Sequence, residues 1–381
     1  MLAVAAVAVL SAAAAPGALA GASCASAVPV GTVRLPAPIV VTTDCGRYRF
    51  DRSGAVRFLR GLALPVPAGA SYYLDLTWYR LRGGHLVVGH RQRTLWRSRG
   101  IFRGRFVDVG AVASSRAAVA YSVFHGRRQS LFVARLGRAE QLVAGGETPL
   151  GFTAAGGLIG QRRWTLLLRS SSQWRPSRVI GRVSRVVFDH STRTVYFVRR
   201  GRLERFDGVR IANLAALAAL RVGPRPQIEP LGRLVGVLGL RRLVVLRADG
   251  TVFASTELPR PLARADAGLS SALAMERDAG AVAFTATRGN TALGSEGTEL
   301  VYLLRPGARA ASVVFRERVG FAVCERGAGL AWRGRRLLYS TSEGRVALID
   351  AADPAASIDL TATVARLPGM GGDGSFDASW S

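Results

Sequence analysis

Short apolar stretches separated by polar turns recur along most of the chain. Residues 243–246 are continuously apolar, which is typical of a strand buried on both faces. Residues 195–197 alternate with more polar neighbours, as half-buried strands do. Asp207-Gly208 and Asp249-Gly250 are hairpin-turn pairs, because glycine readily takes the positive φ that a tight turn needs. The pattern predicts short strands joined by hairpins.

A longer unit of strand, turn, strand, glycine turn and strand repeats along the chain, most clearly at residues 186–208, 234–256 and 329–350. We place its turns at seven glycines: Gly84, Gly126, Gly160, Gly201, Gly250, Gly297 and Gly344. Their intervals of roughly 34 to 49 residues match one four-stranded blade per repeat. The sequence therefore predicts an all-β protein, a β-propeller of seven blades, with six as the alternative.

Two segments carry the repeat in its fullest form, RAAVAYSVFHGRRQSLFVARL at residues 116–136 and GRRLLYSTSEGRVALIDAAD at residues 334–353. Each has a strand with a tyrosine or phenylalanine, a polar glycine turn and a leucine- and valine-rich strand. This pattern resembles the WD40-like repeats of the TolB-type propeller family, over about residues 105–350. The resemblance implies an extracytoplasmic propeller that binds protein or another ligand.

The remaining segments set the expected domain boundaries. We expect a signal peptide at residues 1–20, an extended segment at 21–53, the propeller at 54–367 and a flexible tail at 368–381. Within the propeller, residues 211–220 carry leucines at helical spacing, so we expect one helix there, with an irregular outer strand as the alternative.

The first residues indicate export. An apolar run from Leu2 to Ala15, interrupted only by Ser11, precedes the small-residue sequence Ala18-Leu19-Ala20, as in a secretory signal. The run is too short and too alanine-rich for a membrane span, although a retained anchor is the alternative. We therefore expect an extracytoplasmic protein, secreted or associated with the cell surface, with no transmembrane span in the mature chain.

Export makes a disulfide plausible among the three cysteines. Cys24 lies just after the expected cleavage region, where a lipid could be attached, although Gly21 stands where lipoproteins carry leucine. The expected pair is Cys45 with Cys324, which would connect the N-terminal segment to the last blade.

Basic residues outnumber acidic ones, with 52 against 25 and a formal net charge of +27. All the basic residues are arginine, since the chain contains no lysine. That excludes P-loop, Schiff-base and pyridoxal phosphate chemistry, each of which needs a lysine. The charge favours an anionic partner, although arginine-rich codon usage of a GC-rich genome explains part of it.

Motifs for catalysis or metal binding are absent from the sequence. There is no H-E-x-x-H, Cys-x-x-Cys or G-x-S-x-G. His85 and His90 are spaced as a weak metal pair, Asp75 is a lone acidic residue near Tyr73 and Trp78, and residues 371–377 only partly match a calcium loop. We expect no catalytic residues, no metal site and no cofactor.

The densest basic segment, residues 89–109, interleaves arginines with aromatic residues. Aromatic rings stack on sugars or bases, and guanidinium groups hold anions by two parallel hydrogen bonds. We expect the ligand-binding residues here: Arg93, Trp96, Arg97, Arg99, Arg103 and Arg105. The alternative is two ordinary strands with arginines facing solvent and aromatic side chains facing the core.

These expectations favour a non-catalytic binding module of the bacterial cell envelope. Its partner would be an envelope protein or an anionic glycopolymer; nucleic acid is not expected outside the cytoplasm. The rival functions are a polysaccharide lyase or hydrolase built on a propeller, and a structural module of an envelope assembly.

The first prediction concerns export. We expect residues 1–20 to be removed, because an apolar run followed by a small-residue site is what signal peptidase recognises. N-terminal sequencing of the protein from the envelope or culture medium should give a chain that starts after Ala20. An intact Met1 on cytoplasmic protein would contradict the prediction.

Overall fold

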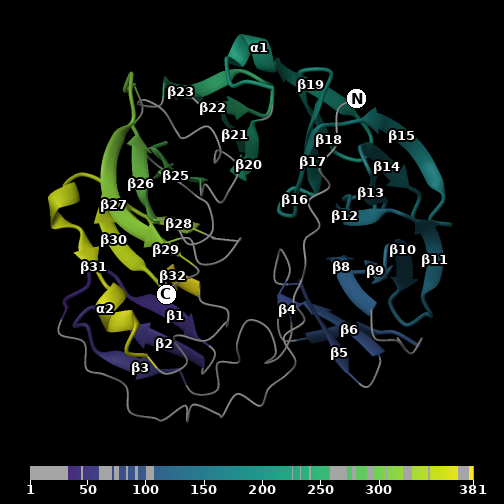
Figure 1. Ribbon diagram of the computed structural model, residues 1–381, viewed down its shortest axis with the longest axis horizontal. Helices are drawn as coiled ribbons and strands as arrows, with labels where there is room; N and C mark the ends of the chain where they lie inside the picture. Colours follow the sequence, from purple (N-terminus) through teal and green to yellow (C-terminus); the bar gives the residue numbers. More distant parts are fainter. Residues whose placement is uncertain are drawn as a thin grey trace.

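The structure is a computed structural model of the chain. It describes residues 33–43, 46–59, 71–72, 77–82, 85–90, 93–99, 107–224, 226–231, 233–239, 242–257, 273–276, 280–289, 296–305, 307–320, 328–341, 344–367 and 377–380. The chain is nearly all β, as predicted. The described residues form eight antiparallel sheets of four strands each, and Figure 1 shows them set side by side around the middle of the molecule.

Four sheets come from the first half of the chain, except that one of them also contains β32 from residues 377–380. In order across each sheet they are β32 (Asp377–Trp380), β1 (Ile39–Thr43), β2 (Gly46–Phe50) and β3 (Val56–Phe58); β4 (Ser71–Tyr72), β5 (Thr77–Arg82), β6 (His85–His90) and β7 (Arg93–Arg97); β8 (Val107–Ser114), β9 (Ala118–His125), β10 (Arg128–Arg135) and β11 (Gln141–Gly145); and β12 (Thr148–Phe152), β13 (Leu158–Arg162), β14 (Thr165–Arg169) and β15 (Pro176–Arg182).

The second half of the chain supplies the other four sheets. They are β16 (Arg185–Asp189), β17 (Thr194–Arg199), β18 (Arg202–Phe206) and β19 (Ile211–Ala216); β20 (Gln227–Leu231), β21 (Leu234–Leu238), β22 (Arg242–Arg247) and β23 (Val252–Glu257); β24 (Leu273–Met275), β25 (Val282–Gly289), β26 (Glu296–Leu304) and β27 (Ser312–Gly320); and β28 (Ala328–Arg333), β29 (Arg336–Thr341), β30 (Val346–Asp350) and β31 (Ile358–Asp359).

Helical structure is sparse in the described residues. It comprises α1 (Leu217–Leu220), α2 (Thr361–Val364) and a 3-10 turn at Pro354–Ala356. The helix expected at residues 211–220 is therefore mostly wrong: β19 takes the first six of them and α1 the last four. The alternative of an outer strand was nearer, because pairing with β18 outweighs the leucine spacing. No described helix is long and apolar enough to cross a membrane.

The core lies between the sheets. Among the described residues, seven hydrophobic clusters each join one sheet to its neighbour, in order from the β4–β7 sheet to the sheet that contains β1. This explains why residues 243–246 of β22 are apolar throughout, since both faces of that strand are covered.

The sheet that contains β1 includes strands from both segments that were expected to flank the propeller. β1 and β2 come from the segment at residues 21–53, and β32 comes from residues 368–381, which were expected to be a flexible tail. Ile39 pairs with Trp380 and Val41 with Ala378, so the last strand of the chain completes the first sheet. The sequence repeat missed this sheet because its strands come from opposite ends of the chain.

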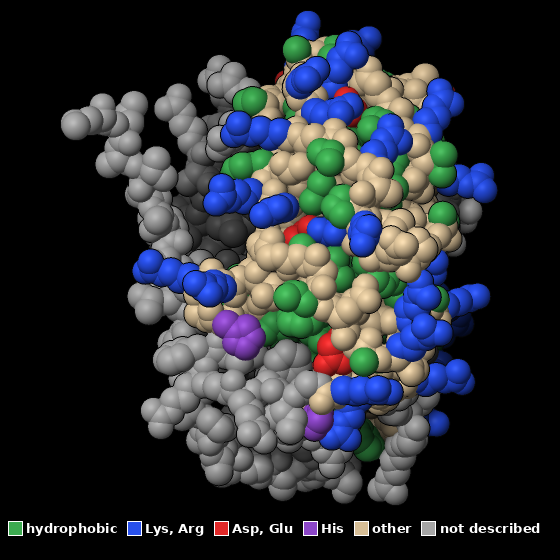
Figure 2. All heavy atoms as spheres, turned by 90° about the vertical axis from the view of Figure 1, so that its right-hand side faces the viewer, with side chains coloured by type: hydrophobic (Ala, Val, Ile, Leu, Met, Phe, Trp, Pro, Cys, Tyr) green, Lys and Arg blue, Asp and Glu red, His purple; other side chains and the backbone are tan. Residues whose placement is uncertain are grey.

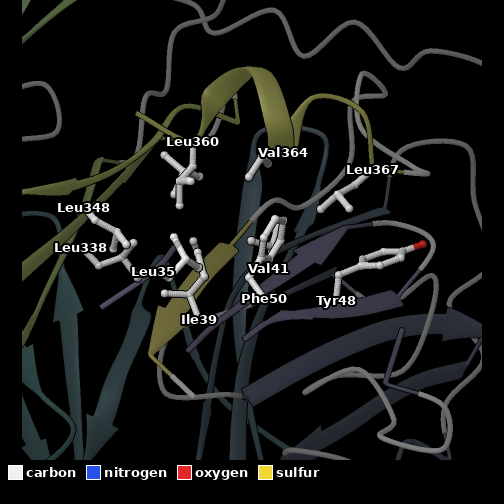
Figure 3. Packing of buried hydrophobic residues seen from close by; sticks show 12 residues of the cluster. Leu35, Ile39, Val41, Tyr48, Phe50, Leu338, Leu348, Leu360, Val364 and Leu367 are labelled. Atoms are coloured by element: carbon white, nitrogen blue, oxygen red, sulfur yellow. The ribbon is translucent and has the colours of Figure 1, made fainter. Parts of the chain in front are cut away.

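A mixed core holds this sheet in place. Figure 3 shows Leu338, Leu348 and Leu360 facing Ile39 and Val41, with Val364 of α2 closing over Phe50. Ile39 and Val41 are completely buried. The strands β1 and β32 therefore pack against the β28–β31 sheet as well as pairing with each other.

Four of the seven assigned glycines lie in turns. Gly126, Gly201 and Gly344 join the second and third strands of a sheet, whereas Gly250 joins β22 to β23. The prediction that Gly160 and Gly297 lie in turns is wrong, because these residues lie within β13 and β26. Gly84 lies outside the described residues. The assigned glycines in turns therefore come from two different places in the four-strand repeat.

The second prediction concerns the pairing of β1 with β32. Removing residues 377–381 deletes the four residue pairs between β32 and β1 and exposes the edge of the buried strand β1. At about 1 kcal/mol for each net backbone hydrogen bond, we expect a loss of at least about 2 kcal/mol in unfolding free energy. Ser379→Ala keeps the backbone and serves as the control. Equal urea midpoints for the truncated and control chains would contradict this role of β32.

Candidate functional site

The residues expected to bind ligand do not form one exposed strip. Arg93, Arg97 and Arg99 are exposed on and just after β7, but Trp96 is only 5% exposed. Its indole N–H donates to the carbonyl of Arg138 (3.1 Å), and its ring packs on Tyr121 at 5.5 Å between centroids. Trp96 is therefore a core residue, and its proposed stacking role is wrong. Arg103 and Arg105 lie outside the described residues.

Several other candidates also lie outside the described residues, namely Cys24, Cys45, Cys324, Asp75 and residues 371–376. The two metal-pair histidines lie at opposite ends of β6. The Nδ1 of His85 is 2.9 Å from the carbonyl oxygen of Ser98, a local structural contact. In the part of the chain that is described, no three His, Cys, Asp or Glu side chains are grouped as metal ligands.

A pocket of about 590 Å³ does gather arginines around an exposed aromatic ring. It lies where β11 ends, beside the turn between β13 and β14 and the end of β15. Its lining comprises Gly145, Gly146, Arg162, Arg163, Trp164, Thr165 and Arg182, and we call it the arginine–tryptophan pocket. Trp164 is 55% exposed. Figure 2 shows the side of the molecule that carries β11 and β15, with arginine side chains projecting along it.

Local hydrogen bonds fix the turn that presents Trp164. Arg162 pairs with Thr165, which leaves Arg163 and Trp164 as a two-residue turn with Arg163 at a φ of 53°. The carbonyl of Trp164 accepts the backbone N–H of Val183 (2.6 Å), and the carbonyl of Arg163 accepts the side-chain amide of Gln161 (2.8 Å). With the backbone held inward, both side chains extend outward into solvent.

A buried ion pair lies behind the pocket. Glu147 follows Gly146 directly and is completely buried. Its two oxygens accept from Nε (2.8 Å) and Nη2 (2.6 Å) of Arg169, whose Nη1 donates to the carbonyl of Trp174 (2.8 Å). This fork-like pair satisfies the carboxylate and fixes the chain at Gly146.

The same ion pair explains Gly160. A Cβ at this position would lie 2.0 Å from Oε1 of Glu147, so no larger residue fits beneath the carboxylate. Gly160 is therefore a glycine that makes room for a side chain within a strand, and not a turn residue as predicted.

The charges at the arginine–tryptophan pocket are unbalanced. Arg162, Arg163 and Arg182 are exposed, and none of them forms an ion pair with another described residue. The described residues that line the pocket include no carboxylate, cysteine or histidine. The lining can hold an anion by guanidinium hydrogen bonds and stack a ring on Trp164.

A second pocket, of about 370 Å³, differs from the arginine–tryptophan pocket because a carboxylate is among its lining residues. Asp350 lies among its lining arginines and forms ion pairs with Arg335 (3.2 Å) and Arg336 (3.8 Å). These internal pairs leave less positive charge for a ligand.

Glycosidase chemistry needs two carboxyl groups, and Asp189 and Glu229 are close enough to interact. Burial, and then the charge of Asp189, raise the pKa of Glu229 to about 7. Both oxygens of Asp189 are engaged in its own turn: Oδ1 accepts the Ser191 hydroxyl (2.7 Å) and Oδ2 the Thr192 hydroxyl (2.6 Å). Neither carboxyl group lines either pocket, so the pair forms part of the packing between β16 and β20.

The chain matches no protein-family model, and no curated protein is similar to it in sequence. Solved structures with a similar arrangement include BamB from Moraxella catarrhalis, with 12% identity, 74% of this chain and 81% of that chain covered, and a TM-score of 0.43. Another is the computationally designed Ika8 protein, with 12% identity, coverage of 85% and 96%, and a TM-score of 0.45. These values assign neither a family nor an activity.

The third prediction concerns Glu229. Because its pKa is raised to about 7 in the folded protein from the usual 4.5, the folded state holds a proton that the unfolded state releases between these values. Stability should therefore fall as pH rises from about 4.5 to about 7. Glu229→Gln should remove this fall and stabilise the protein at about pH 8.

Urea unfolding at several pH values measures the effect. Glu257→Gln, at the exposed end of β23, is the control and should retain the wild-type slope. A Glu229→Gln chain whose stability falls as steeply as wild type would show that Glu229 is not the titrating group.

Proposed function

We propose that this chain is an exported, non-catalytic binding module of the bacterial cell envelope, and that it binds an anionic sugar in the arginine–tryptophan pocket. One observation carries the proposal: three exposed arginines without ion pairs among the described residues surround an exposed tryptophan, in a pocket whose described lining contains no carboxylate. Guanidinium groups would bind the carboxylate or phosphate, and the indole would stack on the sugar ring.

The architecture suits a binding role. We interpret the eight sheets as the blades of a propeller whose ring is joined through β1 and β32. The pocket then lies at the junction of two blades, on turns carried by a rigid scaffold, where binding residues commonly occur. The apolar N-terminal run with its small-residue site supports export, and hence a ligand from the envelope.

The fourth prediction tests the pocket with short probes. Trigalacturonate supplies carboxylates, glucose 6-phosphate supplies a phosphate, and maltotriose is the neutral control. We expect at least one anionic probe to bind and maltotriose not to bind. Trp164→Ala and Arg163→Ala should each weaken binding by about tenfold, because a stacking or charged contact contributes about 1–3 kcal/mol.

Isothermal titration calorimetry measures these affinities, and Arg116→Ala is the matched control. Arg116 is equally exposed but lies in the turn between β8 and β9, at the other end of the sheets. Binding of maltotriose as strong as that of the anions, or unchanged affinity in both pocket variants, would refute the proposal.

A further inference from the structure

The two ends of the sheets differ in charge, and the difference extends beyond the arginine–tryptophan pocket. Turns between second and third strands, together with the links from one sheet to the next, lie at one end, which we call the pocket end. The other turns lie at the far end. Hydrogen bonds join neighbouring sheets at the pocket end: Gln129 Nε2 donates to Thr148 Oγ1 (2.9 Å), and Arg199 Nη1 donates to the carbonyl of Ile180 (2.6 Å).

At the pocket end, three consecutive sheets present exposed arginines. The turn between β9 and β10 carries Arg127 and Arg128, and the turn between β17 and β18 carries Arg200 and Arg202. The pocket turn lies on the sheet between them. None of these four arginines forms an ion pair within the described part of the chain, and the three turns contain no carboxylate.

At the far end of the same sheets, the charges are mixed. Glu140, Asp189 and Asp207 lie there beside arginines such as Arg138 and Arg210. Turn geometry explains the aspartates: Oδ1 of Asp207 accepts the backbone N–H groups of Val209 and Arg210, both at 2.8 Å. The pocket-end turns close without such aspartates. Among the described residues of these three turns the exposed charged side chains are all arginines, and Glu147, in the link between β11 and β12, is buried and paired with Arg169.

We infer that the ligand is a polymer, an anionic polysaccharide that places one sugar in the arginine–tryptophan pocket and continues along the arginines of the turns on both sides. This inference rests on the proposed function and extends it. The pocket lies between the β9–β10 turn and the β17–β18 turn, and both of these turns carry exposed arginines. A polysaccharide that places one sugar in the pocket can therefore continue past a positive turn on each side. Each further anionic sugar of the polysaccharide then lies near the guanidinium group of an arginine that forms no ion pair with another described residue.

The shape and composition of this surface favour a polysaccharide over other polyanions. A single-stranded nucleic acid would need a series of aromatic platforms for successive bases, and Trp164 is the only aromatic side chain in the described parts of these three turns. A lipid bilayer would favour several aromatic side chains at the contact surface, whereas the described parts of these turns present Trp164 alone.

The fifth prediction uses oligogalacturonates of about 3, 6, 12 and 24 units, because linked contacts raise affinity by effective concentration. We expect the wild-type affinity to rise at least about tenfold from the shortest to the longest chain. A flank variant, with Arg127, Arg128, Arg200 and Arg202 each changed to Ser, should keep the trigalacturonate affinity and lose most of the gain with length.

A far-end variant is the charge-matched control, with exposed Arg116, Arg138, Arg175 and Arg210 each changed to Ser. It should retain the length dependence. Trigalacturonate binding with no gain for longer chains would overturn the polymer inference and leave the proposed function intact. Equal losses in both variants would also overturn it, since net charge alone would then explain the gain. Binding to vesicles with about 30% phosphatidylserine, or to a DNA oligonucleotide, more tightly than to the longest saccharide would overturn it in favour of that partner.

Discussion

The pairing of β32 with β1 is the contact on which the rest of the architecture depends. Each four-stranded sheet buries apolar side chains against the sheets beside it. The seven hydrophobic clusters form a series from sheet to sheet. At one end of that series, β32 pairs with β1 and packs beside β28 and β29, so the two ends of the chain share one core with the sheet before them.

Much of the fold could be predicted from local patterns, because strands and turns are local. The alternation of apolar residues and the Asp-Gly pairs at 207–208 and 249–250 indicated strands and hairpins that the structure contains. Longer-range relations could not be predicted in this way. Gly160 resembles a turn residue in sequence, and only the carboxylate of Glu147 lying over it explains its place in β13. The first sheet was missed because its inner strand lies at the opposite end of the chain.

The candidate site shows the same limit. Trp96 and Trp164 both adjoin arginines in the sequence, yet one is buried and the other exposed. The difference depends on position within a hairpin: Trp96 pairs within β7, whereas Trp164 is the second residue of a two-residue turn. The polar run at 161–165 between two apolar strands was a signal that could have marked this turn. The contribution of Gly145 and Gly146 could not be predicted, since it depends on how two sheets meet.

The strand order also determines when each sheet can be completed during synthesis. β1 to β3 are made well before β32, so their sheet lacks one strand until residues 377–380 have been synthesised. At about 5–20 residues per second, that wait lasts tens of seconds, during which the edge of β1 stays open to another chain. Each sheet after β3 is built from four consecutive strands, so it can be completed without such a delay. The edge of β1 therefore stays open to another chain for longer than the strand edges of the sheets built from neighbouring strands.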